Sequence, residues 1–333
     1  MPRAQAVVQF LRTETAGGVA LLAATVAAMV WINIAPVSYA DTWQHKEWIN
    51  DGLMLLFFFV VGLEIKREIV SGELRQPRTA ALPAIAAVGG MVVPALLFLA
   101  VMRGSDGAHG WGIPMATDIA FAVGVLALIG RGLAPGTKIF LLALAIVDDI
   151  GAIIVIALFY GHGWGGARTV GAVALALCIP VRTRSGARPA ERIEESLHPV
   201  VSFAIVPLFA LANAGIRLGG DALRDGFGSR LTWAVIIGLV VGKLIGVSGA
   251  ATLAVRTRAG ERPAGVGRRE TAGIAALAGI GFTVALFVSE LAYEGKAGQL
   301  SDAKLGIFVA SLTSALIGSA ILRAGSSRTS IEK

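Results

Sequence analysis

The stretch IFLLALAIVDDIGAIIVIALFY, residues 139–160, places two adjacent aspartates, Asp148 and Asp149, in the middle of an otherwise uncharged apolar run. A run of this length can cross a bilayer as one α-helix. Each ionised carboxylate near the bilayer centre costs roughly 2.5–3.5 kcal/mol on insertion scales, so such residues usually serve a function. Binding protons or cations is the usual function; a protonated or salt-bridged pair kept for packing is the alternative. The stretch therefore predicts a membrane protein that moves ions.

The composition of the whole chain indicates the same class. Hydrophobic residues make up 55% of the 333 residues, charged residues make up 15%, and the mean hydropathy is +0.74, whereas soluble domains average about 25% charged residues. The net charge of +7 does not indicate a nucleic-acid partner, because the basic residues lie between apolar runs. The single cysteine, Cys178, excludes an internal disulfide. No nucleotide-binding motif is present, so we expect one membrane domain over residues 1–333, without cofactors and without ATP as the energy source.

Apolar runs divide the chain into candidate membrane spans. These spans are residues 17–37, 51–68, 80–102, 111–130, 138–160, 168–181, 199–215, 231–255, 271–293 and 303–322. They predict an all-α polytopic protein with about ten transmembrane helices and with both termini on the same side of the bilayer. Of the 29 Lys and Arg residues, 20 fall in segments on that side and eight on the other. Because positively charged segments stay in the cytoplasm, we expect both termini to be cytoplasmic.

Two further charged residues lie deep within these spans. Asp118 is in the fourth span, and Lys243 is about twelve residues from either end of the eighth. At 1.5 Å per residue that is roughly 18 Å, too far for a lysine to reach the interface. A buried lysine needs a buried carboxylate as a partner, so we expect Lys243 to pair with one member of the Asp148–Asp149 pair.

Helix-breaking residues accompany the buried charges. Pro114 precedes Asp118 in the fourth span, and Gly279 and Gly281 interrupt the ninth. The interrupted span is the middle one of three in each half of the chain, and the two triplets start from opposite sides of the bilayer. Inverted three-helix repeats with discontinuous central helices are typical of secondary transporters, whose site lies at the bilayer midplane. We expect one repeat over about residues 80–160 and the other over about residues 231–322.

Five motifs are spread over nearly the whole chain: GLEIKRE (62–68), WGIPMATDIAFAVGV (111–125), FLLALAIVDDIGAI (140–153), LFALANAG (208–215) and GIGFT (279–283). In these motifs the chain resembles NhaA-type bacterial sodium/proton antiporters. This family is itself an example on which the inverted-repeat generalisation rests, so the repeat pattern and the resemblance are not independent. The agreement is close to word for word at the charged positions.

The resemblance implies roles for the buried polar residues. Asp149 matches the main ligand for sodium and protons, so the transported Na⁺ would be bound by Asp149 and its neighbour Asp148. Asp148 also matches the residue that pairs with the lysine at position 243. Asp118 and Thr117 match a polar pair beside the crossing of the two broken helices. Adjacent helix residues point about 100° apart, so Asp148 and Asp149 need not share one proton.

The resemblance also implies a group of residues that respond to pH. Glu64 and Glu68 match acidic residues in a cytoplasmic funnel, and Glu194 and His198 match another part of the same group. Glu195 stands where some members of the family have histidine. No role is implied for Glu290, late in the ninth span.

The implied function is export of Na⁺ or Li⁺ in exchange for H⁺ across the bacterial inner membrane, with a role in sodium and pH homeostasis. Asp149 would bind a cation or a proton in turn, with the lipid bilayer as the surrounding medium and with a homodimer as one assembly to test. Two alternatives come from other classes. A passive cation channel would conduct Na⁺ without regard to protons. An intramembrane aspartyl protease could use Asp118 and Asp148, but a buried lysine beside them would oppose that chemistry.

The chain departs from the family between Tyr160 and Arg182. The sequence has room there for one short span, Arg168 to Val181, where the family has three. Two helices are therefore expected to be missing between about Gly161 and Val170. The loss of an even number leaves the orientation of later spans unchanged. A truncated, inactive or weakly active member of the family is the alternative to a functional antiporter.

Overall fold

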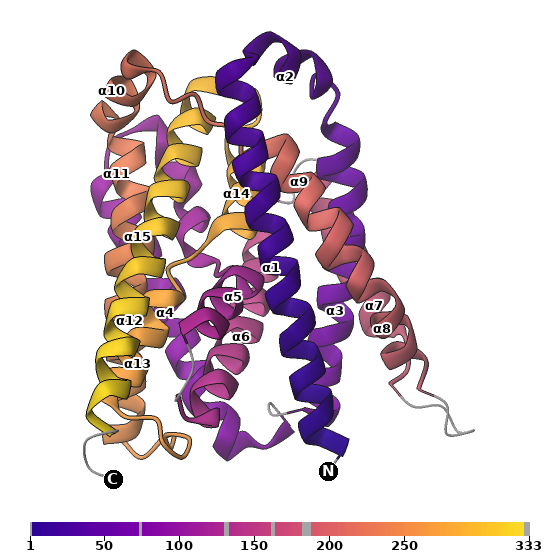
Figure 1. Ribbon diagram of the computed structural model, residues 1–333, viewed down its shortest axis with the longest axis vertical. Helices are drawn as coiled ribbons and strands as arrows, with labels where there is room; N and C mark the ends of the chain where they lie inside the picture. The colour runs from indigo at the N-terminus through magenta and orange to yellow at the C-terminus, as the bar shows by residue number, and fades with distance from the viewer. Residues whose placement is uncertain (1, 73–74, 130–132, 161–163, 182–187, 330–333) are drawn as a thin grey trace. The chain divides into compact units, whose positions relative to one another are not determined.

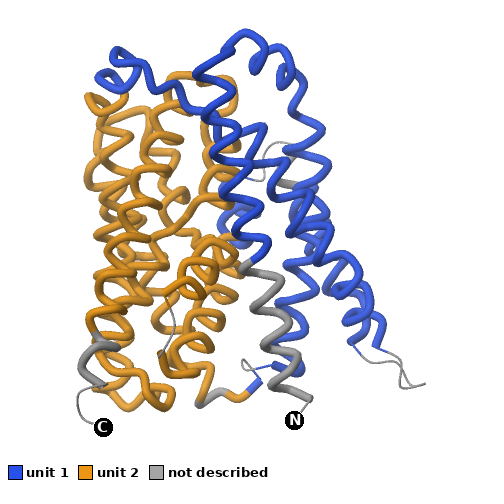
Figure 2. The backbone as a smooth tube through the Cα atoms, in the orientation of Figure 1, with its two compact units in different colours: residues 1–75, 153–225 blue, residues 76–152, 226–333 orange. Residues whose placement is uncertain are grey.

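Helices make up all of the regular structure that the computed structural model assigns to the residues it describes (Figure 1). It describes residues 2–72, 75–129, 133–160, 164–181 and 188–329. The helices form two compact units, which Figure 2 shows in different colours: unit 1 comprises residues 1–75 and 153–225, and unit 2 comprises residues 76–152 and 226–333. The all-α prediction is confirmed.

Unit 1 contains the first helices of the chain and the helices around the GLEIKRE and LFALANAG motifs. They are α1 (Pro2–Ile34), α2 (Pro36–Thr42), the π-helix η1 (Trp48–Leu53), α3 (Met54–Ser71), α7 (Trp164–Cys178), α8 (Pro189–Val200), the π-helix η4 (Val201–Ile205) and α9 (Val206–Asn213). Helix α1 ends where Pro36 forces Ala35 out of the helical conformation. Helix α3 packs on α7, and a Cβ atom on Gly62 would come within 2.9 Å of the Ala176 side chain.

Unit 2 contains both triplets of spans that the sequence identifies as repeats. Its helices are α4 (Pro77–Val101), the 3₁₀ helix η3 (Asp106–Met115), α5 (Ile119–Ile129), α6 (Pro135–Phe159, which continues past residue 152 into unit 1), α11 (Arg230–Ile236), the π-helix η5 (Ile237–Gly242), α12 (Lys243–Arg256), α13 (Arg268–Leu277), α14 (Phe282–Ala292) and α15 (Ala297–Thr329). Helix α10 (Gly220–Gly228) crosses the boundary between the units in sequence.

Small residues bring α4 and α12 close together within unit 2. The Cβ position of Gly89 on α4 would overlap the carbonyl of Gly246 on α12. A Cβ atom on the next residue, Gly90, would lie 2.6 Å from Val247 and 3.7 Å from the Lys243 side chain. Glycine at these contacts lets two membrane helices approach closely, and here it also leaves room for the lysine.

Both central helices are broken, as the sequence predicts. The helix pair Asp106–Met115 and Ile119–Ile129 is bent by 47°, and the pair Arg268–Leu277 and Phe282–Ala292 by 45°. Pro114 itself lies inside η3; Ala116 is extended, and residues 116–118 belong to no helix. Gly279 and Gly281 lie in the second break.

The structure identifies fewer spans by length and composition than the ten expected. Six described helices are long and apolar enough to cross a membrane, or up to eight if each bent pair is one span. The expected span 168–181 corresponds to a shorter apolar helix, Arg168–Cys178. The expected span 51–68 corresponds to η1 and α3, and α3 carries four charged residues in its second half. The prediction of a multi-pass helical membrane protein stands.

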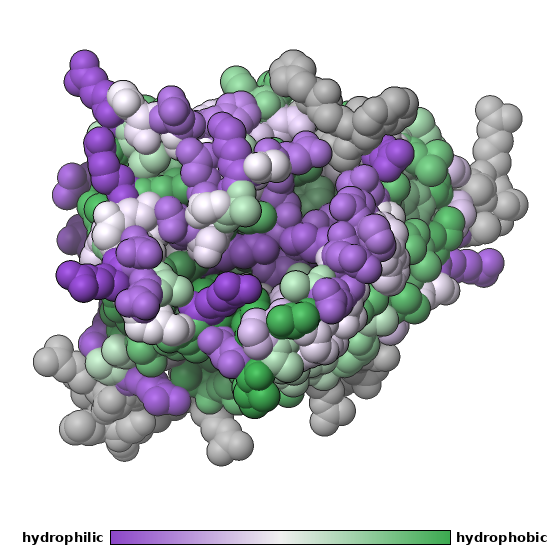
Figure 3. All heavy atoms as spheres, turned by 90° about the horizontal axis from the view of Figure 1, so that it is seen from above, coloured by the Kyte–Doolittle hydropathy of each residue, from purple (hydrophilic) through white to green (hydrophobic). Residues whose placement is uncertain are grey.

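The outer faces of the long helices are apolar. Leu96 on α4, Leu253 on α12 and Leu316 on α15 have about 60% of their surface exposed. Green, hydrophobic side chains of this kind are visible at the surface in Figure 3. Acyl chains of lipid solvate such faces, so exposed leucines are expected on a protein of this class.

Candidate functional site

The candidate site in unit 2 is built around the two aspartates of α6. Asp148 is fully buried, whereas Asp149 keeps 9% of its surface exposed. Successive residues of a helix point about 100° apart, so the two carboxylates face different neighbours. Asp148 points into a cluster with residues from α12 and from the first helix break, as described next.

Asp148 forms an ion pair with Lys243, the first residue of α12. Both side chains are 0% exposed, and the lysine Nζ donates to Asp148 Oδ2. The same Nζ donates to Thr117 Oγ1 at 3.0 Å. Removing both charges from water is costly, and their mutual attraction offsets that cost only with good geometry and additional hydrogen bonds. Thr117 supplies such a bond, so the three residues form one buried polar cluster.

Asp118 joins the two broken helices of unit 2. Its Oδ1 accepts from the backbone N–H of Phe121 at 3.0 Å, in the first turn of α5, and its Oδ2 accepts from the N–H of Thr283 at 2.9 Å, in the first turn of α14. The Thr283 hydroxyl also donates to Oδ2. A carboxylate at a helix N-terminus satisfies free N–H groups and stabilises the positive end of the helix dipole. Asp118 does this for two helices at once.

The breaks also cross at the level of the backbone. The N–H of Asp118 donates to the carbonyl of Ile280 at 2.6 Å. Thr117 Oγ1 lies 2.9 Å from the carbonyl of Ala278 and 2.5 Å from Asp148 Oδ2, so its single proton can be donated to either oxygen. A Cβ atom on Gly281 would lie 3.0 Å from the carbonyl of Ala116. The unwound segments therefore contact each other directly.

One oxygen of the cluster makes no hydrogen bond. Asp148 Oδ1 is buried and has no partner among the residues that the structure describes. A buried polar atom of this kind is uncommon in native proteins and asks for an explanation. Carboxylate, hydroxyl and backbone carbonyl oxygens are the ligands that suit hard cations, and all three kinds of oxygen lie around Thr117. The donor set fits a transported Na⁺ or a proton.

The four residues expected to respond to pH lie in unit 1. Arg67 on α3 forms an ion pair with Glu194 on α8, and it lies 3.7 Å from Glu68 and 4.0 Å from Glu64. His198, one turn after Glu194 on α8, interacts favourably with the same carboxylate. The structure thus brings Glu64, Glu68, Glu194 and His198 together around a single arginine. Sequence analysis did not identify Arg67 as the residue that joins them, although it lies inside the GLEIKRE motif.

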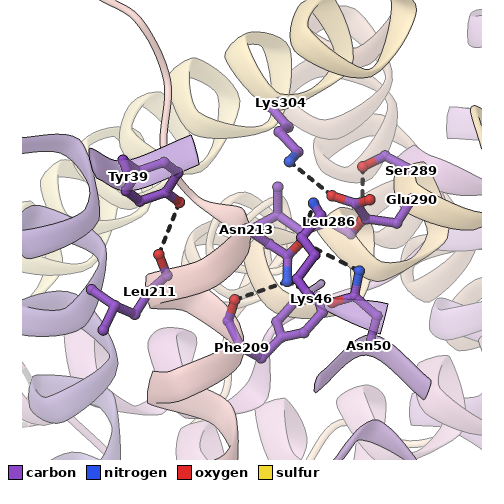
Figure 4. Close-up of polar contacts among 10 residues, drawn as sticks. All are labelled: Tyr39, Lys46, Asn50, Phe209, Leu211, Asn213, Leu286, Ser289, Glu290 and Lys304. Carbon is purple, nitrogen blue, oxygen red and sulfur yellow. Dashed lines mark hydrogen bonds and ion pairs between the residues drawn. The ribbon is translucent and has the colours of Figure 1, made fainter. Parts of the chain in front are cut away.

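A polar cluster around the LFALANAG motif was also missed. In unit 1 the buried Asn213 side chain accepts from Lys46 Nζ at 2.7 Å and donates to Asn50 Oδ1 at 2.7 Å (Figure 4). The Tyr39 hydroxyl donates to the carbonyl of Leu211 at 2.9 Å. No periodic pattern links these positions, because they meet only through the packing of separate helices.

A second, largely buried ion pair in unit 2 was missed as well. Lys304 Nζ on α15 lies 2.8 Å from Glu290 Oε1 on α14 (Figure 4). Sequence analysis singled out Glu290 without a role and did not connect it to Lys304, which lies at the start of the expected span 303–322. The only signal available was a carboxylate near the end of an apolar span.

Comparisons with known proteins are consistent with this geometry. A model of the family described as Na+/H+ antiporter 1 matches residues 8–166 and residues 164–322. The Na(+)/H(+) antiporter NhaA 1 of Pseudomonas putida is 41% identical over 386 residues, which covers 97% of each chain. The Na(+)/H(+) antiporter NhaA 2 of Novosphingobium aromaticivorans is 42% identical and 95% of each chain is covered. The Na(+)/H(+) antiporter NhaA of an Acidovorax species is 43% identical, covering 92% of this chain and 88% of the relative.

The alignments also bear on the expected deletion. The alignment with the Pseudomonas putida protein has 386 positions, whereas 97% of 333 residues is about 323, so about 63 positions contain no residue of this chain. The two segments of the family match adjoin at residues 164–166. A loss of about 63 residues is enough for two membrane helices of about 20 residues with their connections. Residues 161–163 of the expected junction lie outside the described residues.

Proposed function

The chain belongs to the Na+/H+ antiporter 1 family, and we propose that it exports Na⁺ or Li⁺ in exchange for H⁺ through the buried cluster on α6. Membership makes the chain a transporter rather than an enzyme, which removes the intramembrane protease from consideration. The observation that carries the finer proposal is the wholly buried Asp148–Lys243 ion pair beside the crossing of two broken helices.

Asp149 is the residue that exchanges the two ions. Asp148 is held by Lys243 and Thr117, so its charge is already balanced. Asp149, next to it on α6, keeps a small exposed surface and faces another direction. A carboxylate that a cation and a proton can reach in turn, but not together, couples the two flows without ATP. Protons that enter the cell down their gradient then drive the export of sodium.

The breaks in the two central helices allow the site to open to each side of the membrane in turn. Unwound backbone contacts at Ala116, Ala278 and Ile280 hold η3, α5, α13 and α14 around one point. Half-helices can tilt about such a crossing while Asp118 keeps both N-termini capped. Alternating access around a fixed midplane site is the mode of transport that this arrangement supports.

The acidic group of unit 1 provides the response to pH. Glu64, Glu68 and Glu194 surround Arg67, and His198 lies beside Glu194. Histidine changes its charge near neutral pH, and coupled carboxylates respond to the same change. The group is a sensor on the cytoplasmic side, separate from the transport chemistry.

The protein lies in the bacterial inner membrane with both termini in the cytoplasm. The asymmetry of Lys and Arg supports this orientation. A C-terminal reporter fusion, and labelling of a cysteine introduced at the exposed Asp225 in a Cys178→Ser background, test it. A periplasmic C-terminus would contradict an even number of spans. The mass of the purified protein in detergent distinguishes a monomer from a homodimer.

The direct test of function is the dequenching of a pH-sensitive dye in everted vesicles. Addition of Na⁺ or Li⁺ should dissipate the proton gradient and dequench the dye, whereas addition of K⁺ should not. A response to all three cations, or a sodium flux that ignores the proton gradient, would instead identify a passive channel. The measurement therefore decides function and broad selectivity together.

A second candidate is a weakly active or inactive family member. The absence of about 63 aligned positions supports it, because the missing helices would have buried apolar surface between the repeats. The central residues are all present, so we favour an active protein with lower stability than a relative of full length. Side-by-side dequenching with the Pseudomonas putida relative distinguishes a reduced response from none.

A further inference from the structure

The ion pair between Glu290 and Lys304 lies at the end of the second broken helix. Their side chains are only 13% and 10% exposed, and Nζ lies 2.8 Å from Oε1. Glu290 is in the last turn of α14, and Lys304 is in the second turn of α15. Both helices belong to candidate membrane spans. Two charges within spans indicate a function by default, and the proposed function uses neither.

Glu290 lies on the same face of α14 as the central site. It is seven residues after Thr283, which is close to two full helical turns and roughly 10.5 Å along the axis. Thr283 binds Asp118 through both its hydroxyl and its N–H. The face of α14 that begins at the crossing of the broken helices therefore carries one carboxylate further along, at Glu290.

The end of α14 is a favourable place for a cation. A helix C-terminus carries a partial negative charge from its free carbonyl groups, and the Glu290 carboxylate adds a full one. A carboxylate alone would be destabilised there, so a positive partner is needed. The ammonium group of Lys304 supplies that charge, much as Lys243 does for Asp148.

Neighbouring contacts hold this end of α14 in place. The Tyr293 hydroxyl donates to the carbonyl of Gly107 at 2.7 Å, and its ring is fully buried against Gly110. Within α14 itself, the Ser289 hydroxyl donates to the carbonyl of Leu286 at 2.7 Å (Figure 4), so Tyr293 supplies the contact with another element. Glu290 is thus carried on a fixed helix end, which is the arrangement that a binding position requires.

We propose that Glu290 is a second, transient binding position for the transported Na⁺ or Li⁺, on the outer side of the central site. Lys304 balances its carboxylate between passages, and the cation takes the place of the ammonium group as the ion moves out. The inference rests on the proposed function and on its orientation, which directs the end of α14 outward. The competing explanation is that the ion pair only stabilises the packing of α14 against α15.

The test measures the Na⁺ concentration for half-maximal exchange from each face, in everted and in right-side-out vesicles. Glu290→Gln should raise the outer-face value by at least about tenfold, as expected when a charge-assisted contact is lost. The inner-face value should stay close to that of the unchanged protein. Glu294→Gln is the matched control, because Glu294 is exposed just beyond the same helix, and it should change neither value. An unchanged outer-face value in Glu290→Gln would overturn the inference.

Exchanging the two charges distinguishes a role of the pair in cation binding from a purely structural role. Glu290→Lys combined with Lys304→Glu restores an ion pair, so the melting temperature lost in Glu290→Gln should recover. The outer-face affinity should not recover, because the exchange moves the carboxylate to α15, away from the face of α14 that continues from the central site. Recovery of both the melting temperature and the outer-face affinity would show that the pair only stabilises the packing of the two helices. If the unchanged protein shows no Na⁺-dependent exchange, the proposed function fails as well. If it shows exchange and the Glu290 variants keep its outer-face Na⁺ affinity, only this inference is overturned.

Discussion

The buried cluster of unit 2 and the acidic group of unit 1 use the same chemistry in different surroundings. In each, a Lys or Arg side chain forms an ion pair with a carboxylate from another helix: Lys243 with Asp148, and Arg67 with Glu194. Lys243 and Asp148 are wholly buried, whereas Arg67 is 30% exposed and, although Glu194 is buried, Glu64 and Glu68 remain partly exposed. Charge interactions grow stronger as water is excluded. The first cluster is therefore suited to bind a cation tightly, and the second is suited to respond to the pH of the solution.

Removal of Lys243 should give the largest loss of stability. Lys243→Ala leaves Asp148 buried without its cation, and the loss of one partner of a buried pair costs about 3–5 kcal/mol. The melting temperature in detergent should fall accordingly, and Asp148→Asn in the same protein should restore part of it. Lys296→Ala, at an exposed lysine, should leave the melting temperature unchanged. Strictly additive losses in the double variant would show that Lys243 and Asp148 are not partners.

Variants of Asp118 should have a graded, smaller effect. Asp118→Ala removes two helix caps, each of which contributes about 0.5–2 kcal/mol. Asp118→Asn keeps one accepting oxygen and therefore one cap, so about half of the loss is expected. Thermal unfolding of both variants, with Asp225→Ala as the exposed control, measures the series. Equal losses for the two substitutions would contradict capping of both α5 and α14 by one carboxylate.

Removal of Arg67 should have the smallest effect on stability and a clear effect on the pH profile. Arg67→Gln should cost about 1 kcal/mol or less, because the arginine is partly solvated. Arg67 stabilises the charged form of the Glu194 carboxylate, so without this positive charge half-maximal exchange should move to higher pH. The control is Arg188→Gln, whose side chain is 60% exposed and pairs with Glu191. A loss of maximal rate with an unchanged profile would place Arg67 in the transport machinery instead.

Sequence analysis anticipated what depends on composition and local pattern. The apolar runs predicted the helices, and Pro114 before Asp118 together with Gly279 and Gly281 predicted the two breaks. The residues Asp118, Asp148 and Lys243 stood out because charge inside an apolar span is rare. These features can be recognised without knowing which helices are neighbours.

The missed features depend on contacts between distant segments. The double cap at Asp118 and the approach of Gly89 to Gly246 each join residues far apart in the chain. The pair of Glu290 with Lys304 joins two successive helices and depends on how they pack. Helical periodicity predicts which side of a helix is apolar but not which helix lies against it. The sequence therefore supported a list of candidate residues, and the structure adds the way in which they are connected.

The central claim is that Asp149 binds the proton and the sodium ion in turn. Asp149→Asn keeps the size of the side chain and removes the charge that both ions require. Dye dequenching in everted vesicles, normalised to the amount of inserted protein, should show no response to Na⁺ or Li⁺. Asp225→Asn, the same substitution at an exposed aspartate, should respond like the unchanged protein. Substantial Na⁺-dependent dequenching in Asp149→Asn would contradict the account.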